Sequence, residues 1–451
     1  MKYAVVTFGC RVNQAESFGL AGELRASGGE AVEADRADLV VVNTCSVTAV
    51  ADQGARQAIR HIARTNPSAR IVVTGCYATR RPADLRGLPG VTRLVANADK
   101  SRLVTAIAPE LGLKGAPRAG DGEDGRGLTL RHGREGRTAY FLPVQTGCDE
   151  HCAYCIVPST RGPSRSRPLE EVTREAARAS RAGFKEAILT GVHLGSYGRD
   201  LDPARSLADL LRAVDEHGGE ARYRLSSIEP MDCAPAVIDL VAGSGRFAPH
   251  LHLPLQHASD RMLRAMRRPY SVPFYRRLVD SIRRRLPDAA IGTDLIVGFP
   301  GETDDDFRQC VEFLDDSPLT SVHVFCYSDR PGTAAAGMTP KVHAGTVKRR
   351  AEALRARARD LSRRFQASQI GSVRRSLTLG DGTLALTDNY LKVRIPPGHA
   401  RNEWVDVKVL EGDDVLAGVV VGTPRPRSIP VMPAKATIQP ASASGFRRAP
   451  D

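Results

Sequence analysis

Three cysteines lie close together near the middle of this 451-residue chain: Cys148, Cys152 and Cys155, spaced C-x3-C-x2-C. Three thiolates at this spacing can hold one metal centre, but they leave a four-coordinate site one ligand short. A site with three protein ligands and one open position is typical of a working centre, in which a small molecule fills the open position. The spacing of this core triplet therefore favours an iron–sulfur cluster with an external ligand.

Two other interpretations stay open from the spacing alone. Zinc could bind the three thiolates with His151 as a fourth ligand, although His151 is adjacent to Cys152 and neighbouring side chains seldom point the same way. A disulfide fits less well, because a group of three cysteines leaves one thiol over.

The elements that must position these residues can be read along the chain. Residues 1–110 alternate apolar strand patterns with helical patterns, which predicts a parallel α/β domain. Residues 137–365 repeat the alternation about six times, which predicts a partial barrel of the TIM type. Short β runs in 366–425 predict a small β-barrel. Residues 111–136 are predicted to be a linker, and 426–451 a disordered basic tail. The fold class is therefore α/β.

A second set of cysteines falls at the strand ends of the first domain. Cys10, Cys45 and Cys76, the N-terminal triplet, each follow the end of a predicted strand. Parallel strands end at one edge of their sheet, where ligands bind, so these thiols are expected to converge. The helix N-termini that follow favour thiolates. Three unrelated buried cysteines are the alternative interpretation.

Charge and hydropathy limit the partners. The net charge of +13 indicates a polyanionic partner, with nucleic acid the leading candidate and an arginine-rich solvated surface the alternative. The sequence starts without a signal-peptide pattern, and no apolar stretch approaches the ~18 residues of a membrane span. We therefore expect a cytoplasmic protein with no membrane contact. In that setting its nine cysteines indicate metal binding or catalysis.

The motifs around the cysteines resemble a known family. The core triplet after the first barrel strand resembles that of radical S-adenosylmethionine (SAM) enzymes. TFGCRVNQ at 7–14, VNTCSVT at 42–48 and TGCYA at 74–78, with a terminal barrel similar to a TRAM RNA-binding domain, resemble the methylthiotransferase family over about 2–425. GCRVNQ and the segment LTGVHLGSYG at 189–198 are most similar to the subgroup that acts on N6-threonylcarbamoyladenosine in tRNA.

The resemblance implies a cofactor set. The core triplet would ligate a catalytic [4Fe–4S] cluster whose fourth iron binds SAM, and one-electron reduction would cleave SAM to methionine and a 5′-deoxyadenosyl radical. The N-terminal triplet would ligate a second [4Fe–4S] cluster, which carries the sulfur to be inserted. Two SAM molecules would then be used to place a methylthio group on carbon 2 of the adenine at position 37 of tRNA. The alternatives are the same chemistry on N6-isopentenyladenosine tRNA or on a ribosomal protein, or a non-catalytic RNA-binding protein with zinc or a structural cluster.

Further residues are candidates for cofactor binding. Thr190, Gly191, Glu229 and Gln256 lie at or just after predicted strand ends, where polar groups face the mouth of a barrel. Arg161 follows the core triplet closely, and its guanidinium could pair with the SAM carboxylate or with RNA phosphate. Ordinary turns and a solvated basic loop are the competing interpretations.

The expected partners follow from the same resemblance. They are the anticodon loop of tRNA, an electron donor and a sulfur donor, and the sequence does not identify the two donors. In the terminal barrel, Lys392, Arg394 and Lys408 are candidates for phosphate contacts.

Overall fold

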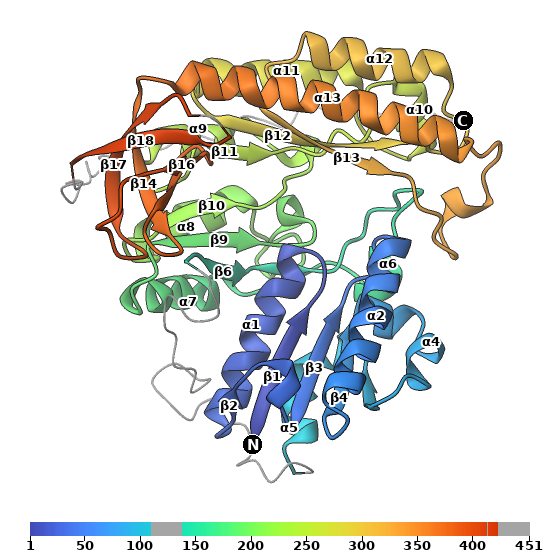
Figure 1. Cartoon of the computed structure of the whole chain (residues 1–451). Helices are drawn as coiled ribbons and strands as arrows, with labels where there is room; N and C mark the ends of the chain where they lie inside the picture. Colours follow the sequence, from blue (N-terminus) through green and yellow to red (C-terminus); the bar gives the residue numbers. More distant parts are fainter. Residues whose placement is uncertain (110–137, 413, 423–451) are drawn as a thin grey trace.

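The protein has three parts, an N-terminal α/β domain, a central half-barrel and a C-terminal β-barrel (Figure 1). The structure, a computed structural model, describes residues 1–109, 138–412 and 414–422. The predicted linker 111–136 and the predicted tail 426–451 lie outside the described residues. Within the described residues no helix is both long and apolar enough to cross a bilayer.

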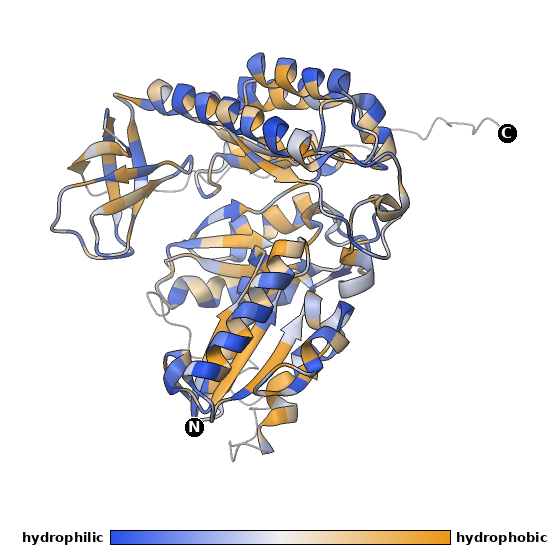
Figure 2. Ribbon diagram, turned by 45° about the vertical axis from the view of Figure 1, so that its right-hand side comes forward, coloured by the Kyte–Doolittle hydropathy of each residue, from blue (hydrophilic) through white to orange (hydrophobic). Residues whose placement is uncertain are grey.

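The N-terminal domain is a parallel five-stranded sheet in the order β2-β1-β3-β4-β5. Its central strand is buried on both faces, since Val40 and Val42 belong to one hydrophobic core and Leu39 and Val41 to another. Figure 2 shows hydrophobic residues concentrated in these strands. The continuous apolar runs in the sequence therefore mark strands covered by helices on both sides. The elements are β1 (Lys2–Thr7), α1 (Arg11–Ala26), β2 (Glu30–Ala31), β3 (Leu39–Thr44), α2 (Ala49–Thr65), β4 (Arg70–Gly75), α3 (Cys76–Arg80), α4 (Ala83–Arg86), β5 (Val91–Val95) and α5 (Leu103–Ile107).

The central part consists of two parallel three-stranded sheets, β6-β9-β10 and β11-β12-β13. A parallel bridge between Ser227 and His252 joins them edge to edge, so the strands form the partial barrel predicted from the sequence. A short antiparallel pair, β7 (Gln145–Thr146) and β8 (Arg165–Ser166), lies beyond the end of β6. The other strands are β6 (Tyr140–Pro143), β9 (Glu186–Thr190), β10 (Arg222–Leu225), β11 (His250–His252), β12 (Ala290–Val297) and β13 (Ser321–Cys326). The helices are α6 (Val157–Arg161), α7 (Leu169–Arg181), α8 (Leu207–His217), α9 (Pro235–Gly243), α10 (Asp260–Ala265), α11 (Val272–Arg285), α12 (Asp304–Asp315) and α13 (Ala344–Gln369).

The two faces of the half-barrel differ in polarity. Tyr223, Leu225 and Leu251 pack into the core beneath the helices. Because side chains alternate along a strand, their neighbours in β10 and β11 face the inside of the half-barrel. The inner face therefore carries charged and polar groups in place of the apolar layers that fill a closed barrel. Its members are Glu186, Thr190, Arg222, Arg224, His250, His252, Asp294 and His323.

The C-terminal part is a closed five-stranded barrel in the order β14-β15-β16-β18-β17. Helix α13 runs through 366, the start predicted for this barrel, and the first barrel strand begins at Val373. The five predicted short β runs are all strands here, with apolar side chains alternating into a small core. The strands are β14 (Val373–Leu379), β15 (Leu384–Thr387), β16 (Lys392–Arg394), β17 (Trp404–Leu410) and β18 (Leu416–Gly422).

A buried ion cluster docks the C-terminal barrel onto the half-barrel. Glu186 Oε2 lies 2.9 Å from both Arg222 Nη2 and Arg224 Nη2. Each arginine also donates a hydrogen bond to a main-chain carbonyl of the barrel, Arg222 to Arg375 and Arg224 to Asp388. Burial alone would raise the pKa of Glu186, but the two guanidinium groups lower it to about 2.

Glu186→Gln should therefore destabilise the protein by about 3 kcal/mol, because it leaves buried arginines without a counter-charge. The stability from this group is complete above the ordinary pKa of 4.5 and is lost as the pH falls towards 2, since folding depresses the pKa. Thermal unfolding at pH 7 and pH 4 measures both effects. Glu216→Gln is the control, because the Glu216 side chain is 69% exposed. Equal melting temperatures of the two variants would contradict the prediction.

Candidate functional site

The N-terminal triplet gathers at the carboxyl edge of the sheet. Cys10 follows β1, Cys45 follows β3 and Cys76 begins α3 directly after β4, and these three strands are adjacent and parallel. Burial and, to a smaller extent, the nearby thiols of Cys10 and Cys76 raise the pKa of Cys45 to about 11, against the hydrogen bonds from the main chain of Val47 and Ser46. The structure therefore brings together the three residues that the sequence placed at strand ends, while their role as ligands stays a prediction.

Two glycines allow this convergence. Gly9 and Gly75 precede Cys10 and Cys76, with φ of +95° and +99°. A Cβ at Gly9 would lie 2.4 Å from Cys45 Cβ, and one at Gly75 would lie 2.2 Å from the Thr44 carbonyl oxygen. Only glycine combines the left-handed backbone with such close approach, so the Gly-Cys pairs set the distance between the loops.

The core triplet lies in the loop closed by β7 and β8. Gly147 precedes Cys148 with φ of +72°, and a Cβ there would lie 1.8 Å from the Pro163 carbonyl oxygen. Gln145 Nε2 donates to the Gly147 carbonyl at 2.9 Å and to Ser164 Oγ at 2.9 Å. These contacts fold the loop back on itself and fix the direction in which Cys148 leaves β7.

Each sulfur atom of the core triplet has a nitrogen partner. Such partners stabilise negative charge on thiolate sulfur, which is what a metal-bound cysteine carries. Arg268 was not foreseen from the sequence, because nothing in its local pattern connects it with a cysteine 116 positions away. The pairs are Cys148 Sγ with His193 Nδ1 at 3.7 Å, Cys152 Sγ with Arg268 Nη1 at 2.9 Å, and Cys155 Sγ with Val157 N at 3.4 Å.

The spacing of the sulfur atoms argues against a single zinc ion in either triplet. Tetrahedral zinc at about 2.3 Å from each sulfur holds the sulfurs about 3.8 Å apart. Among the described residues, the only three His, Cys, Asp or Glu ligand atoms that lie within 4.8 Å of one another belong to His252, Asp294 and His323. The three sulfur atoms of each triplet are thus farther apart than the ligands of a single zinc ion. Two sets of three thiols, with a nitrogen near each sulfur of the core triplet, fit multi-iron clusters better.

A single side chain, that of Asn97, connects the surroundings of the two triplets. Helix α6 begins two residues after Cys155, and Asn97 Nδ2 donates to the carbonyl of Thr160 in this helix at 2.9 Å. The same Asn97 nitrogen lies 3.5 Å from Cys76 Sγ. One side chain therefore connects the helix after the core triplet with a cysteine of the N-terminal triplet.

Two buried ion pairs hold the N-terminal domain on the half-barrel. Arg161 Nη1 lies 2.7 Å from Glu16 Oε1 in α1. Asp52 Oδ2 lies 2.6 Å from Arg330 Nη1, and Asp52 Oδ1 also accepts a hydrogen bond from Ser46, the residue after Cys45. The second pair therefore anchors the Cys45 loop as well as the domain.

The contact between Arg161 and SAM stays a prediction, and the structure gives the Arg161 guanidinium two partners in the N-terminal domain. The Arg161 side chain is 3% exposed, and its Nη2 donates to Asn13 Oδ1 at 2.5 Å in addition to the pair with Glu16. Burial would raise the pKa of Glu16, but Lys100 and Arg161 lower it to about 2. The Arg161 guanidinium is held at the domain interface, because the ionised and buried carboxylate of Glu16 pairs with it there.

Two of the other residues that are expected to contact SAM, Glu229 and Gly191, lie close to the core triplet. Glu229 pairs with Arg268, the residue that also contacts Cys152. Gly191 lies against the loop-forming Gln145, since a Cβ on it would approach Gln145 Oε1 to 3.0 Å. Glu229 and Gly191 are thus brought next to the core triplet.

Thr190 and Gln256 form hydrogen bonds with the main chain of the half-barrel. Thr190 is buried at the end of β9, and its hydroxyl donates to the Ile188 carbonyl at 2.9 Å. Gln256 has φ of +72°, and its main chain bonds to that of Asp294 and Ile296 in β12. Their proposed contact with SAM rests on their position at strand ends.

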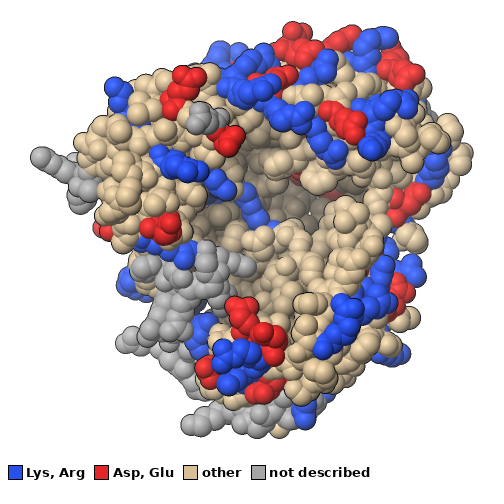
Figure 3. All heavy atoms as spheres, viewed as in Figure 1, with Lys and Arg blue, Asp and Glu red and all other residues tan. Residues whose placement is uncertain are grey.

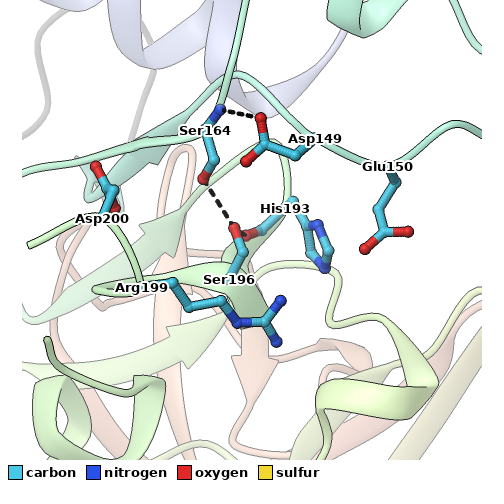
Figure 4. A pocket seen from close by; sticks show the side chains of 7 residues that line it. All are labelled: Asp149, Glu150, Ser164, His193, Ser196, Arg199 and Asp200. Carbon is cyan, nitrogen blue, oxygen red and sulfur yellow. Dashed lines mark hydrogen bonds between the residues drawn. The ribbon is translucent and has the colours of Figure 1, made fainter.

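A small polar pocket of about 160 Å³ adjoins the core triplet (Figure 4). His193 lines it and connects it to Cys148, while His193 Nε2 lies 2.5 Å from Asp232 Oδ2. The pocket is smaller than the ~300 Å³ of ordinary ligand pockets, so it does not hold SAM by itself. The lining residues are Asp149, Glu150, Ser164, His193, Ser196, Arg199 and Asp200.

Comparison with known proteins agrees with this arrangement. Residues 142–314 match the Radical SAM superfamily, and residues 2–97 match a family described as uncharacterized protein family UPF0004. The fold is similar to that of the radical SAM methyltransferase TsrM from Kitasatospora setae, with a TM-score of 0.54, 18% identity, and coverage of 74% of this chain and 77% of that one. The half-barrel therefore has the fold of the radical SAM superfamily, whose enzymes use SAM with a [4Fe–4S] cluster.

Curated relatives narrow the family. The chain is 35% identical over 411 residues to the threonylcarbamoyladenosine tRNA methylthiotransferase MtaB of Thermotoga maritima, covering 90% of this chain and 93% of that protein. It is 34% identical to the MtaB of Bacillus subtilis, with coverages of 86% and 88%. It is 33% identical to a tRNA-2-methylthio-N(6)-dimethylallyladenosine synthase of Lawsonia intracellularis, with coverages of 82% and 85%. The chain belongs to the radical SAM tRNA methylthiotransferases and is of the MtaB type.

Proposed function

We propose that this enzyme transfers a methylthio group to carbon 2 of N6-threonylcarbamoyladenosine at position 37 of tRNA, with two [4Fe–4S] clusters and two SAM molecules. The observation that carries the proposal is the connection of the two cysteine triplets through Asn97 and α6. The names of the MtaB relatives support the substrate. An electron donor and a sulfur donor are required in addition.

The chain's own residues would prepare the site for both groups. When bound, the cluster of the core triplet with SAM supplies a radical that removes hydrogen from carbon 2, and the cluster of the N-terminal triplet supplies sulfur. Arg268 donates to Cys152 Sγ and pairs with Glu229, so it places positive charge beside a negatively charged ligand sulfur. The main-chain N–H of Val157 does the same at Cys155.

The C-terminal barrel offers a surface for phosphates. Lys392 and Arg394 are exposed on β16, and Lys408 is exposed on β17. Both strands pair with β18, where Arg394 lies opposite Ala417 and Lys408 opposite Val419. The three cations therefore share the outer face of the barrel on either side of β18, which suits contacts with an RNA backbone.

Metal analysis after anaerobic reconstitution tests the two-cluster part of the proposal. We expect about eight irons and about eight sulfides per chain, since each [4Fe–4S] cluster contributes four of each. Bound zinc, or about four irons with no cleavage of SAM, would contradict the proposal and favour a non-catalytic RNA-binding protein.

Nucleoside mass analysis tests the substrate. In tRNA from cells that lack this gene, 2-methylthio-N6-threonylcarbamoyladenosine should disappear while N6-threonylcarbamoyladenosine accumulates. Return of the wild-type gene should restore the modified nucleoside. An unchanged level of it, with loss of 2-methylthio-N6-isopentenyladenosine, would show that the substrate is the other tRNA nucleoside.

A further inference from the structure

Two stacked histidines and a carboxylate form a cluster on the inner face of the half-barrel. Asp294 Oδ1 on β12 lies 2.9 Å from His252 Nε2 on β11 and 3.2 Å from His323 Nδ1 on β13. The ring centroids of the two histidines are 5.2 Å apart. Because the members sit on adjacent, paired strands, their relative positions are set by the backbone of the sheet.

The charges of this cluster follow from its hydrogen bonds. Burial raises the pKa of Asp294, but the bonds from His252 and His323 outweigh burial and lower it to about 2. The bond to Asp294 raises the pKa of His323, against burial and the nearby positive charge of Arg11. One oxygen of Asp294 faces both rings, so the cluster is satisfied without a cation. The His323 side chain is 65% exposed and offers its free edge to solvent.

Arg11 places a guanidinium close enough to the cluster for its charge to lower the pKa of His323. It follows Cys10 directly, and its Nη2 lies 3.3 Å from the hydroxyl of Tyr390 in the C-terminal barrel. The Tyr390 ring in turn lies 4.5 Å from the ring of His250 on the inner face. Arg11 therefore lies where the three parts of the molecule meet. Figure 3 shows a hollow there, with Lys and Arg side chains reaching into its wall.

We propose that Arg11 and His323 bind the carboxylate at the end of the N6 substituent of the target nucleoside, and so select threonylcarbamoyladenosine over adenosines with a neutral N6 alkyl group. This inference rests on the proposed function. Asp294 and His252 act as positioning residues that orient the His323 ring.

Adenine geometry supports this assignment. Carbon 2 and N6 lie on the same edge of the base, on either side of ring nitrogen 1, and enzymes that modify a base read this edge in their pocket. Under the proposed function, sulfur comes to carbon 2 from the cluster of the N-terminal triplet, so the N6 substituent would begin close to Arg11, the residue after Cys10. A cation there forms a charge-assisted hydrogen bond with a carboxylate. Beside an isopentenyl group the same cation would lose its hydrating water and form no hydrogen bond in exchange.

The test compares three anticodon stem-loop RNAs that differ only at N6 of the target adenosine: threonylcarbamoyl, its methyl ester, and isopentenyl. The ester keeps the shape of the substrate and removes its charge. KM and kcat are measured for the reconstituted wild type, Arg11→Gln and His323→Gln, and binding of each RNA to the cluster-free proteins is measured by anisotropy. Arg36→Gln is the matched control, because Arg36 precedes β3 at the opposite edge of the same sheet.

Wild type should prefer the acid over the ester by about tenfold to hundredfold in kcat/KM and in affinity. Arg11→Gln and His323→Gln should lose most of this preference, mainly through KM, while iron content and RNA-free SAM cleavage stay at wild-type level. Arg36→Gln should keep the preference. Retention of the preference in both site variants would overturn the inference, whereas a wild type inactive on the threonylcarbamoyl RNA would overturn the proposed function itself.

Discussion

Replacing Cys45 with Ala should abolish methylthiolation of tRNA and leave cleavage of SAM close to the wild-type rate. Cys45 belongs to the N-terminal triplet, whereas the cluster that is proposed to bind SAM would be held by the core triplet. Loss of one of the three ligands should remove the second cluster and halve the iron content. A cluster that is held by only three protein thiolates has no spare protein ligand. Product formation should fall below detection, by about 10³-fold or more. Mass analysis of tRNA nucleosides and of 5′-deoxyadenosine measures the two activities separately.

Cys152→Ala is the partner experiment. This variant should lose SAM cleavage and methylthiolation together, since Cys152 is held beside Arg268 in the core triplet. Cys326→Ala is the control, because Cys326 is exposed at the end of β13. If Cys45→Ala and Cys152→Ala failed at the same step, the division of labour between two clusters would be wrong.

Gly147→Ala should abolish the core cluster without removing any ligand. A Cβ at this position would lie 1.8 Å from a main-chain oxygen of Pro163, and the backbone has φ of +72°, so the loop must open to relieve the clash. We expect about four irons per chain in place of eight, and SAM cleavage reduced by at least about 10²-fold. Iron analysis and the rate of 5′-deoxyadenosine formation measure the outcome.

Gly19→Ala is the matched control for this substitution. Gly19 lies within helix α1, and a Cβ there would meet no atom within 4 Å beyond its chain neighbours and the backbone of its own helix. The variant should keep eight irons and gain about 1 kcal/mol of stability, since alanine favours a helix more than glycine does. Wild-type iron content in Gly147→Ala would show that the loop tolerates the change and that its geometry is not required.

Local pattern was sufficient to predict the placement of the cysteines. Strand ends in a parallel sheet share an edge, so Cys10, Cys45 and Cys76 could be brought together from sequence alone. The same reasoning predicted the six strands of the half-barrel and the five of the C-terminal barrel. These features depend on hydrophobic periodicity and on turn residues, and both can be recognised within a short stretch of sequence.

Contacts between distant segments could not be predicted in this way. Arg161 pairs with Glu16, 145 positions earlier, because the N-terminal domain docks against α6. The polar inner face was also missed, although alternation in Arg222-Tyr223-Arg224 and His250-Leu251-His252 was a signal for it. Strands with one polar face indicate that a cavity, and not a packed barrel interior, lies on that side.

The pairs Glu16–Arg161 and Asp52–Arg330 have a consequence for how an RNA substrate would reach the two cysteine triplets. Parting the N-terminal domain from the half-barrel would strip partners from two buried ion pairs, at a cost of several kcal/mol for each. A hinge along this seam is therefore a poor entry route for an RNA loop. Under the proposed function the target adenosine would instead have to swing out of its own stack, so the conformational change would fall mainly on the nucleic acid.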